Sequence, residues 1–365
     1  MCKRIFKDQT SDEGEVPFYK IGTFGGAPDA YITRELFEEY KKTYQYPSKG
    51  DILISASGSI GRTIEYTGED EYFQDSNIVW LKHGENLDNS FLKVLYSIVE
   101  WSCEGSTIKR LYNDNFLKTE FMLPKIDEQI KIGKYFRKLD HLITLHQRKC
   151  DDTKELKKYM LQKMFPKNGE KFPEIRFKGF TEAWEQRKLG EVFKEYSKKN
   201  HTELPALTII QGGGTVKREE SDRNLMYDES NLSNYKMVRK DDFIVHLRSF
   251  EGGLEKSLLD GIISPAYHTF HSDVADSRFY YPYFRSHEFI KHKLVPHIYG
   301  IRDGRSIDIA GMKTIEIPYT SIEEQRKIGD YLESLDHLIT LHQRKCDTLK
   351  ELKKYMLQNM FPKKG

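Results

Sequence analysis

Two stretches of the chain carry mostly apolar residues at intervals of three or four positions, the pattern of one face of an α-helix. In the second stretch the steps are 4, 3, 4, 4, 3, 3, 4 and 4, through Tyr331, Leu335, Leu338, His342, Cys346, Leu349, Leu352, Met356 and Met360. The first stretch has the same stripe 196 residues earlier, except that Thr153 replaces Leu349. Because neither stretch contains a proline before Pro166 or Pro362, we expect two helices of roughly 40 residues each.

These two stretches are near-copies of each other. Residues 126–167 and 322–363 are identical at 33 of 42 positions, whereas the blocks that precede them share only a loose outline. A helix of this length does not bury an apolar face against itself, and its simplest partner is the other copy, packed antiparallel as a coiled coil. The alternative is that each helix packs on its own domain, although helices in globular proteins are usually much shorter.

The two preceding blocks have the pattern of mixed α/β domains. In the first, the apolar residues 51–55 predict a strand, the Ser/Gly-rich residues 56–61 a turn and residues 62–66 a return strand, whereas residues 34–42 predict a helix. In the second block, residues 242–247 take the place that residues 51–55 have in the first, and a Gly-containing segment follows them as well. The sequence therefore predicts an α/β (α+β) domain in two copies, residues 1–125 and 186–320. Two long antiparallel helices, residues 126–166 and 321–365, separate them, and residues 167–185 form a linker.

Composition narrows the possible environments. Lys and Arg (58) nearly balance Asp and Glu (56), so the chain lacks the strong basic footprint of a generic nucleic-acid binder. Cys2, Cys103, Cys150 and Cys346 have neither disulfide-framework nor metal-site spacing, which favours the reducing cytoplasm. No apolar run approaches the 18 residues of a membrane span.

Three motifs, in order along the chain, point to a known family. They are GDILIS-x-x-GSIGR at residues 50–62, WEQRKLGEV at 184–192 and EEQRKIG at the start of the second long helix. Together with the alternation of variable and repeated blocks, they resemble the specificity subunit of type I restriction-modification systems. The leader at 184–192 has no counterpart before the first block, so we expect that block to be either naturally cut at this edge or truncated.

The resemblance implies a DNA sequence-specificity subunit without catalysis of its own. Each variable block is then a target-recognition domain that reads one half of a bipartite target on double-stranded DNA. The helices set the spacing and dock two methyltransferase (modification) subunits, and restriction/translocase subunits complete the assembly. No cofactor is expected in this chain: S-adenosylmethionine belongs to the methyltransferase, and ATP and Mg belong to the restriction subunit.

Candidate DNA contacts are polar residues in the variable blocks. Arg and Asn pair with guanine and adenine edges, whereas Ser and Lys bind phosphates. The candidates in the first block are Lys20, Arg34, Ser57, Ser59, Arg62, Asn77, Lys109, Arg110, Tyr112 and Asn113. Those in the second are Gln211, Lys217, Arg218, Arg223, Arg248, Tyr299, Arg302 and Arg305. The turn at Ser57 to Gly61 is equally consistent with a purely structural tight hairpin.

Two other classes of function compete with this interpretation. A self-contained nuclease of the PD…ExK kind would use Asp29, Glu39 and Lys41, but its carboxylates must come from adjacent strands, whereas residues 34–42 predict a helix. A coiled-coil interaction protein without DNA is the third possibility. Such a protein would show no salt-dependent binding to any duplex.

Overall fold

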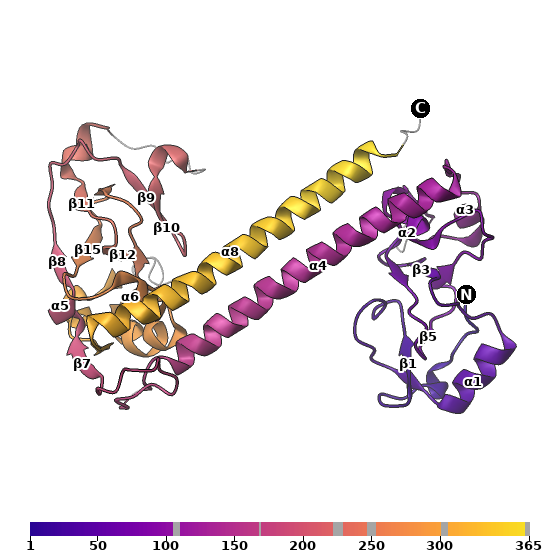
Figure 1. The fold of residues 1–365 in the computed structure, drawn as a ribbon, viewed down its shortest axis with the longest axis horizontal. Coiled ribbons are helices and arrows are strands. Elements are labelled where there is room, and N and C mark those ends of the chain that lie inside the picture. The colour runs from indigo at the N-terminus through magenta and orange to yellow at the C-terminus, as the bar shows by residue number, and fades with distance from the viewer. Residues whose placement is uncertain (105–109, 168, 222–228, 247–252, 301–305, 362–365) are drawn as a thin grey trace. The chain divides into compact units, whose positions relative to one another are not determined.

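The computed structural model describes residues 1–104, 110–167, 169–221, 229–246, 253–300 and 306–361. It divides into two compact units. Unit 1 comprises residues 1–146 and 344–365, and unit 2 comprises residues 147–343. Each of the two long helices, α4 (Ile126–Lys163) and α8 (Ile322–Asn359), therefore contributes one part to each unit (Figure 1).

Unit 1 contains two small three-stranded sheets. In the first, β1 (Val16–Tyr19) pairs antiparallel with β2 (Tyr31–Ile32) and parallel with β5 (Tyr72–Phe73). In the second, β3 (Ile52–Ser55) pairs antiparallel with both β4 (Thr63–Glu65) and β6 (Ile78–Trp80). The helical elements besides α4 and α8 are η1 (Lys7–Gln9), α1 (Arg34–Thr43), α2 (Asn89–Ile98) and α3 (Asn113–Leu117). The predicted strands at 51–55 and 62–66 and the helix at 34–42 are confirmed.

Strand β3 is buried on both faces, which explains its uninterrupted apolar sequence. Successive side chains of a strand point to opposite faces. Ile52 and Ile54 pack with Leu92 and Tyr96 of α2, whereas Leu53 packs with the cluster that contains Tyr72 of the first sheet. The strand therefore joins two hydrophobic clusters of the first variable block.

Unit 2 is built around a four-stranded antiparallel sheet. Its order is β13 (Glu255–Lys256), β12 (Phe243–His246), β15 (Tyr267–His271) and β8 (Lys194–Tyr196). Four two-stranded pairs surround it: β9 (Leu207–Ile210) with β10 (Gly214–Lys217), β11 (Lys236–Val238) with β14 (Gly261–Ile263), β16 (Ile298–Tyr299) with β17 (Ser306–Ile307), and β7 (Glu185–Lys188) with β18 (Glu316–Tyr319). The helical elements are α5 (Leu189–Val192), η2 (Arg218–Glu220), η3 (Glu229–Asn234), α6 (Ser277–Phe284), η4 (Phe289–Leu294), η5 (Val295–His297) and α7 (Ile309–Met312).

The two variable blocks share the arrangement of their central strands. The order β4-β3-β6 in unit 1 recurs as β13-β12-β15 in unit 2, in each case with the first strand of the three in the middle. Within residues 242–247, which the sequence places in correspondence with the strand at 51–55, residues 243–246 form β12. Among the described residues, no helix has a stretch both long and apolar enough to cross a membrane.

The long helices pack against each other antiparallel within each unit, as the sequence predicted (Figure 1). In unit 2, Lys157 of α4 binds Asp336 of α8 at 2.5 Å. In unit 1, Lys353 of α8 binds Asp140 of α4 at 2.5 Å. At the offset of 196, Lys353 corresponds to Lys157 and Asp140 corresponds to Asp336. The second ion pair therefore repeats the first with the two helices exchanged. Both units thus use the same helix-to-helix contacts.

The predicted apolar stripe was wrong in part. Leu338, Leu352 and Met360 are exposed. One continuous row of buried and partly buried positions in α8 instead follows the steps 4, 3, 4, 3, 4, 3, 4 and 3, through Ile328, Leu332, Leu335, Ile339, His342, Cys346, Leu349, Lys353 and Met356. This is a repeat of 3.5 residues, because two helices that wrap around each other face their partner at that interval rather than at 3.6.

Each variable block docks onto its long helix through one helix N-terminus. In unit 1, Asp88 caps α2, and its backbone N–H donates to Oε1 of the buried Gln129 of α4 at 3.0 Å. One turn further along α4, Gly133 lies against the start of α2. A Cβ atom on Gly133 would lie 2.0 Å from Oγ of Ser90. Only glycine permits this close approach of the two helices.

Unit 2 repeats this docking with residues 196 positions later in the long helix. Asp276 caps α6, and its backbone N–H donates to Oε1 of the buried Gln325 of α8 at 3.0 Å. Gly329 then faces the start of α6, where an added Cβ would lie 3.1 Å from Cβ of Arg278. The same glutamine and glycine therefore set the register between block and helix in both units.

Candidate nucleic-acid interface

Four loops of unit 1 meet beside the end of β3. We call them the loop cluster: residues 20–26, 55–62, 74–77 and 110–113. Backbone hydrogen bonds join them, because the N–H of Ala56 donates to the Asn77 carbonyl at 2.8 Å and the N–H of Leu111 donates to the Ala56 carbonyl at 2.8 Å. The N–H of Ile21 donates to Oε1 of Gln74 at 2.8 Å. Segments far apart in the sequence thus present their side chains from one place.

The turn at the centre of the loop cluster is built by glycines. Gly58 and Gly61 have φ angles of 65° and 88°, the left-handed region that other residues rarely adopt. A Cβ on Gly61 would also lie 2.9 Å from the Trp101 ring nitrogen. Oγ of Ser55 donates to the Ser59 carbonyl at 2.5 Å and accepts from the Arg62 N–H at 3.0 Å. The structural interpretation of this turn therefore has direct support, and it leaves the Ser59 side chain exposed.

Ser57 and Asn77 form one polar pair inside the loop cluster. Oγ of Ser57 donates to Oδ1 of Asn77 at 2.8 Å, and the Ser57 side chain is buried. Residues 57 and 110 are bridge partners, which places Arg110 beside this pair with an exposed side chain. Ser57 orients the Asn77 amide, whose nitrogen is the group suited to a base edge.

The loop cluster also holds most of the other candidates from the first block. Arg62 is exposed, and its Nη2 donates to the Ile21 carbonyl at 3.2 Å. Lys20 pairs with Asp29 at 2.8 Å. Tyr112 and Asn113 are exposed at the start of α3. Lysine and arginine at the rim of a polar turn are suited to phosphate contacts.

Two candidates of the first block are not placed in the loop cluster. Arg34 begins α1, where its guanidinium pairs with Asp70 at 2.5 Å. Hydrogen bonds from Arg34 and then from Lys41 lower the pKa of the Asp70 carboxyl, so this pair stays charged at neutral pH. Lys109 lies outside the described residues.

The candidates of the second block lie on separate elements of unit 2. Gln211 is exposed at the tip of the β9–β10 hairpin, and Lys217 at its far end pairs with Glu220 at 3.7 Å. The Arg218 guanidinium lies over the Tyr235 ring at 5.5 Å. Tyr299 is 59% exposed on β16. Arg223, Arg248, Arg302 and Arg305 lie outside the described residues.

Sequence reasoning missed Glu255, the carboxylate that holds the tip of the β9–β10 hairpin in place. Buried Glu255 accepts from the Gly212 N–H at 2.7 Å and from the Tyr281 hydroxyl at 2.9 Å, and it forms an ion pair with Arg285. Burial, followed by the charge of Glu255, raises the pKa of Tyr281, so its hydroxyl remains a neutral donor. No local sequence signal marks Glu255, because its partners lie up to 43 residues away.

The three residues of the nuclease alternative are not assembled into a site. Glu39 and Lys41 lie on α1, as the sequence predicted, and Lys41 binds Asp70 at 3.1 Å. Asp29 pairs with Lys20 instead. Within the described ranges there is also no group of three His, Cys, Asp or Glu side chains placed to hold a metal ion.

Comparison with known proteins decides the family. A family model described as "Type I restriction modification DNA specificity domain" matches residues 1–154 and 181–351. The chain belongs to this family. It is a DNA sequence-specificity subunit, and the fold class predicted from its sequence is confirmed. The nuclease and DNA-free alternatives have no support.

Individual relatives agree with this assignment. A Haemophilus influenzae protein, "Putative type I restriction enzyme specificity subunit S.HindORF215P", is 56% identical over 144 residues, which are 39% of this specificity subunit and 37% of that relative. The Methanocaldococcus jannaschii "Type I restriction enzyme MjaVIII specificity subunit" is 24% identical over 327 residues, 84% of this chain and 74% of that protein.

A solved structure supports the fold. It is the "Crystal structure of Type-I restriction-modification system S subunit from M. genitalium", which is similar with a TM-score of 0.61 at 15% identity. The similarity covers all of this specificity subunit and 93% of that chain.

Proposed function

We propose that this specificity subunit reads a bipartite site on double-stranded DNA, one half with each variable block, and performs no chemistry itself. The first block uses the loop cluster of unit 1. The second uses the β9–β10 hairpin and the other candidate residues of unit 2. The observation that carries the proposal is the repeated docking: each block is fixed to its long helix by the same glutamine and glycine, while the loops that it presents differ.

Two linked readers make physical sense for a genome-scale search. A half-site of three or four base pairs occurs far too often among ~10⁶ or more competing sites to give useful specificity. Joining the two readers through a stiff helix pair makes the second recognition step intramolecular. The two specificities then multiply when the half-sites have the matching spacing, and binding weakens when they do not.

The long helices are the proposed docking surface for two methyltransferase subunits. Identical residues are exposed in both copies, including the aromatic pair Tyr159 and Tyr355 and the basic pair Lys158 and Lys354. Tyrosine is enriched where proteins bind each other. The methyltransferase subunits would supply S-adenosylmethionine, and further restriction/translocase subunits would supply the ATP- and Mg-dependent steps.

Exchange of residues 186–320 for the second block of another specificity subunit tests the proposal. Sequencing of methylated DNA from cells that carry the chimaera should show one half of the target changed and the other half retained. The reciprocal control replaces residues 1–125 and should change only the other half. A change in both halves after either exchange would contradict the assignment of one block to each half-site.

A further inference from the structure

The β9–β10 hairpin of unit 2 ends in a three-residue loop that carries one side chain only. The two strands stay paired up to Ile210 and Gly214, which leaves Gln211 and two glycines as the loop. Gly212 has a φ angle of 79°, and a Cβ atom on Gly213 would lie 2.9 Å from Cγ2 of Ile210. Both positions therefore favour glycine, and Gln211 is the exposed side chain of the loop.

Glu255 binds the backbone of this loop to α6. The Glu255 side chain is only 7% exposed, and its Oε1 accepts from the Gly212 N–H at 2.7 Å. The same carboxylate accepts from the Tyr281 hydroxyl at 2.9 Å and pairs with the Arg285 guanidinium, both at α6. A buried carboxylate requires partners of this kind, because burial of an unpaired charge is costly. One side chain thus holds the loop and the docked helix together.

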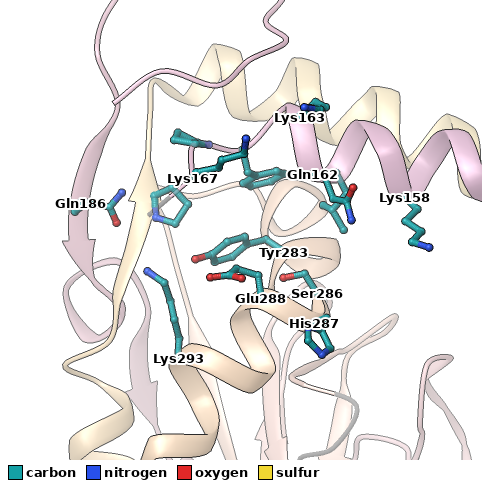
Figure 2. A pocket seen from close by; sticks show the side chains of 14 residues that line it. Lys158, Gln162, Lys163, Lys167, Gln186, Tyr283, Ser286, His287, Glu288 and Lys293 are labelled. Atoms are coloured by element: carbon teal, nitrogen blue, oxygen red, sulfur yellow. The ribbon is translucent and has the colours of Figure 1, made fainter. Parts of the chain in front are cut away.

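Helix α6 is itself held by both long helices. The backbone N–H of its N-cap donates to Gln325 of α8 at 3.0 Å. Towards its other end, the ring of Phe165, which follows α4, stacks on Tyr283 with 5.2 Å between the ring centroids. Figure 2 shows Tyr283 below Gln162 of α4, where the two helices line a pocket of about 680 Å³. The position of the loop is therefore fixed to the helix pair through Glu255 and α6.

A second cavity lies next to the loop. It measures about 460 Å³, and the loop glycines line it together with Lys157 and Asp336 of the long helices. A loop beside open space moves unless specific bonds hold it. The hydrogen bond from Gly212 to Glu255 ties this loop to the rest of unit 2. Loss of the Glu255 carboxylate would therefore free the loop without removing any of its own residues.

A glutamine at the tip of a hairpin suits one DNA base in particular. The major groove of B-DNA admits a two-stranded β-ribbon, and a glutamine amide accepts from N6 and donates to N7 of adenine. The glycines beside Gln211 add no side chain that would keep the backbone away from the groove. The two hydrogen bonds to adenine must form together, so their strength depends on the distance and angle at which the amide is held.

We propose that Gln211 reads an adenine in the half-site of the second block, and that Glu255 is the positioning residue that holds Gln211 at the required geometry. This inference rests on the proposed function of the second block. Glu255 does not touch DNA and acts through the Gly212 N–H. Removal of its charge should therefore relax the choice of base at one position of one half-site. The other half-site and the gap should stay as they are.

Sequencing of methylated DNA from cells that carry the subunit with its methyltransferase tests both roles. With the unaltered chain, one position of the half-site assigned to the second block should require adenine. Gln211→Ala should reduce this preference by about tenfold, and Glu255→Gln should reduce the preference at the same position by a similar factor. Tyr281→Phe keeps the ring but removes one contact of Glu255, so it should give a smaller change in the same direction.

The matched control is Asp242→Asn, which removes another buried carboxylate of unit 2. Asp242 lies at the start of β12 and binds His271 and Tyr196 rather than the hairpin. Its replacement should lower the temperature of unfolding, as Glu255→Gln does, but the methylated sequence should stay the same. The comparison separates a loss of stability from a loss of positioning.

Four results would overturn the proposal. An unchanged methylated sequence with Gln211→Ala would show that the loop does not read DNA. A preference for another base at the position that depends on Gln211 would overturn the assignment of adenine. Evenly weaker methylation with Glu255→Gln, without a change of preferred base, would make Glu255 a stabilising residue only. A change in the other half-site would instead contradict the assignment of one block to each half-site, on which the inference rests.

Discussion

Lengthening both long helices by one heptad should lengthen the gap between the two half-sites. Residues 140–146 and 336–342 have the same sequence, DHLITLH. Duplicating them after His146 and His342 preserves the alternating steps of four and three along both buried faces. Seven residues add about 10.5 Å at 1.5 Å per residue. DNA rises about 3.4 Å per base pair, so the preferred gap should grow by about three base pairs.

The rotation of the DNA helix affects how efficiently the lengthened chain supports methylation, but the preferred gap should still become longer. Three base pairs turn the second half-site by about 100° around the duplex axis, since one turn takes 10 to 10.5 base pairs. Seven residues complete two turns of a coiled-coil helix and leave the buried face where it was. The DNA must therefore twist to meet both readers, which costs binding energy. We expect weaker methylation together with a longer preferred gap.

The assay uses the assembled methyltransferase and a pool of duplexes that contain both half-sites with gaps from zero to five base pairs longer than the natural one. Sequencing of the methylated fraction reports the preferred gap. A control chain carries the duplication in α4 alone, which leaves seven residues without a partner in α8, and it should unfold at a lower temperature. A folded, doubly lengthened chain that keeps the natural gap would refute the role of the helices in spacing.

Three further predictions concern the stability of the units. Alanine normally stabilises a helix relative to glycine, but Gly133→Ala should lower the free energy of unfolding by about 1–3 kcal/mol in urea titrations, and Gly329→Ala by less, because its neighbours lie farther away. Burial lowers the pKa of His271, but its hydrogen bond to Asp242 outweighs burial and raises this pKa above 6.5. The pair therefore contributes its full stabilisation below pH 6.5, and this stabilisation is lost as the pH rises. His271→Gln should abolish this pH dependence of the free energy of unfolding, measured from pH 5.5 to 8. Glu324→Gln should lower the free energy of unfolding by about 3–5 kcal/mol, since it leaves the half-buried Arg176 guanidinium without its carboxylate partner. A loss below about 1 kcal/mol would contradict a stabilising role for this ion pair.

Much of the fold was predictable because it depends on local pattern and on the internal repeat. The helix from Ile126 and its copy, the strand at 51–55 and the helix at 34–42 follow from periodicity and are confirmed. The error in the apolar stripe has a physical origin. Periods of 3.6 and 3.5 residues differ by less than one position over three turns, and only the contact with the partner helix selects between them.

The candidate site was predictable only in part, because tertiary contacts decide which polar side chains are available. The glycine turn at 58–61 was visible in the sequence. The burial of Ser57 under Asn77 and the pairing of Arg34 with Asp70 join residues 20 and 36 positions apart, for which a single sequence carries no signal. The role of each candidate in DNA contact stays a prediction.

The arrangement separates the residues that hold each block from the loops that we propose to face DNA. Gln129 and Gln325, together with the glycines one turn later, fix the blocks through backbone groups at helix N-termini, which almost any sequence supplies. The loop cluster and the β9–β10 hairpin contribute nothing to that contact. Replacement of loop side chains that do not contact Gln129 or Gln325 therefore leaves these hydrogen bonds in place, whereas Tyr281 of α6 ties the β9–β10 hairpin to the docked helix through Glu255. A subunit built in this way changes its target sequence without losing its register on the helix pair, which is the property that a measuring scaffold for DNA requires.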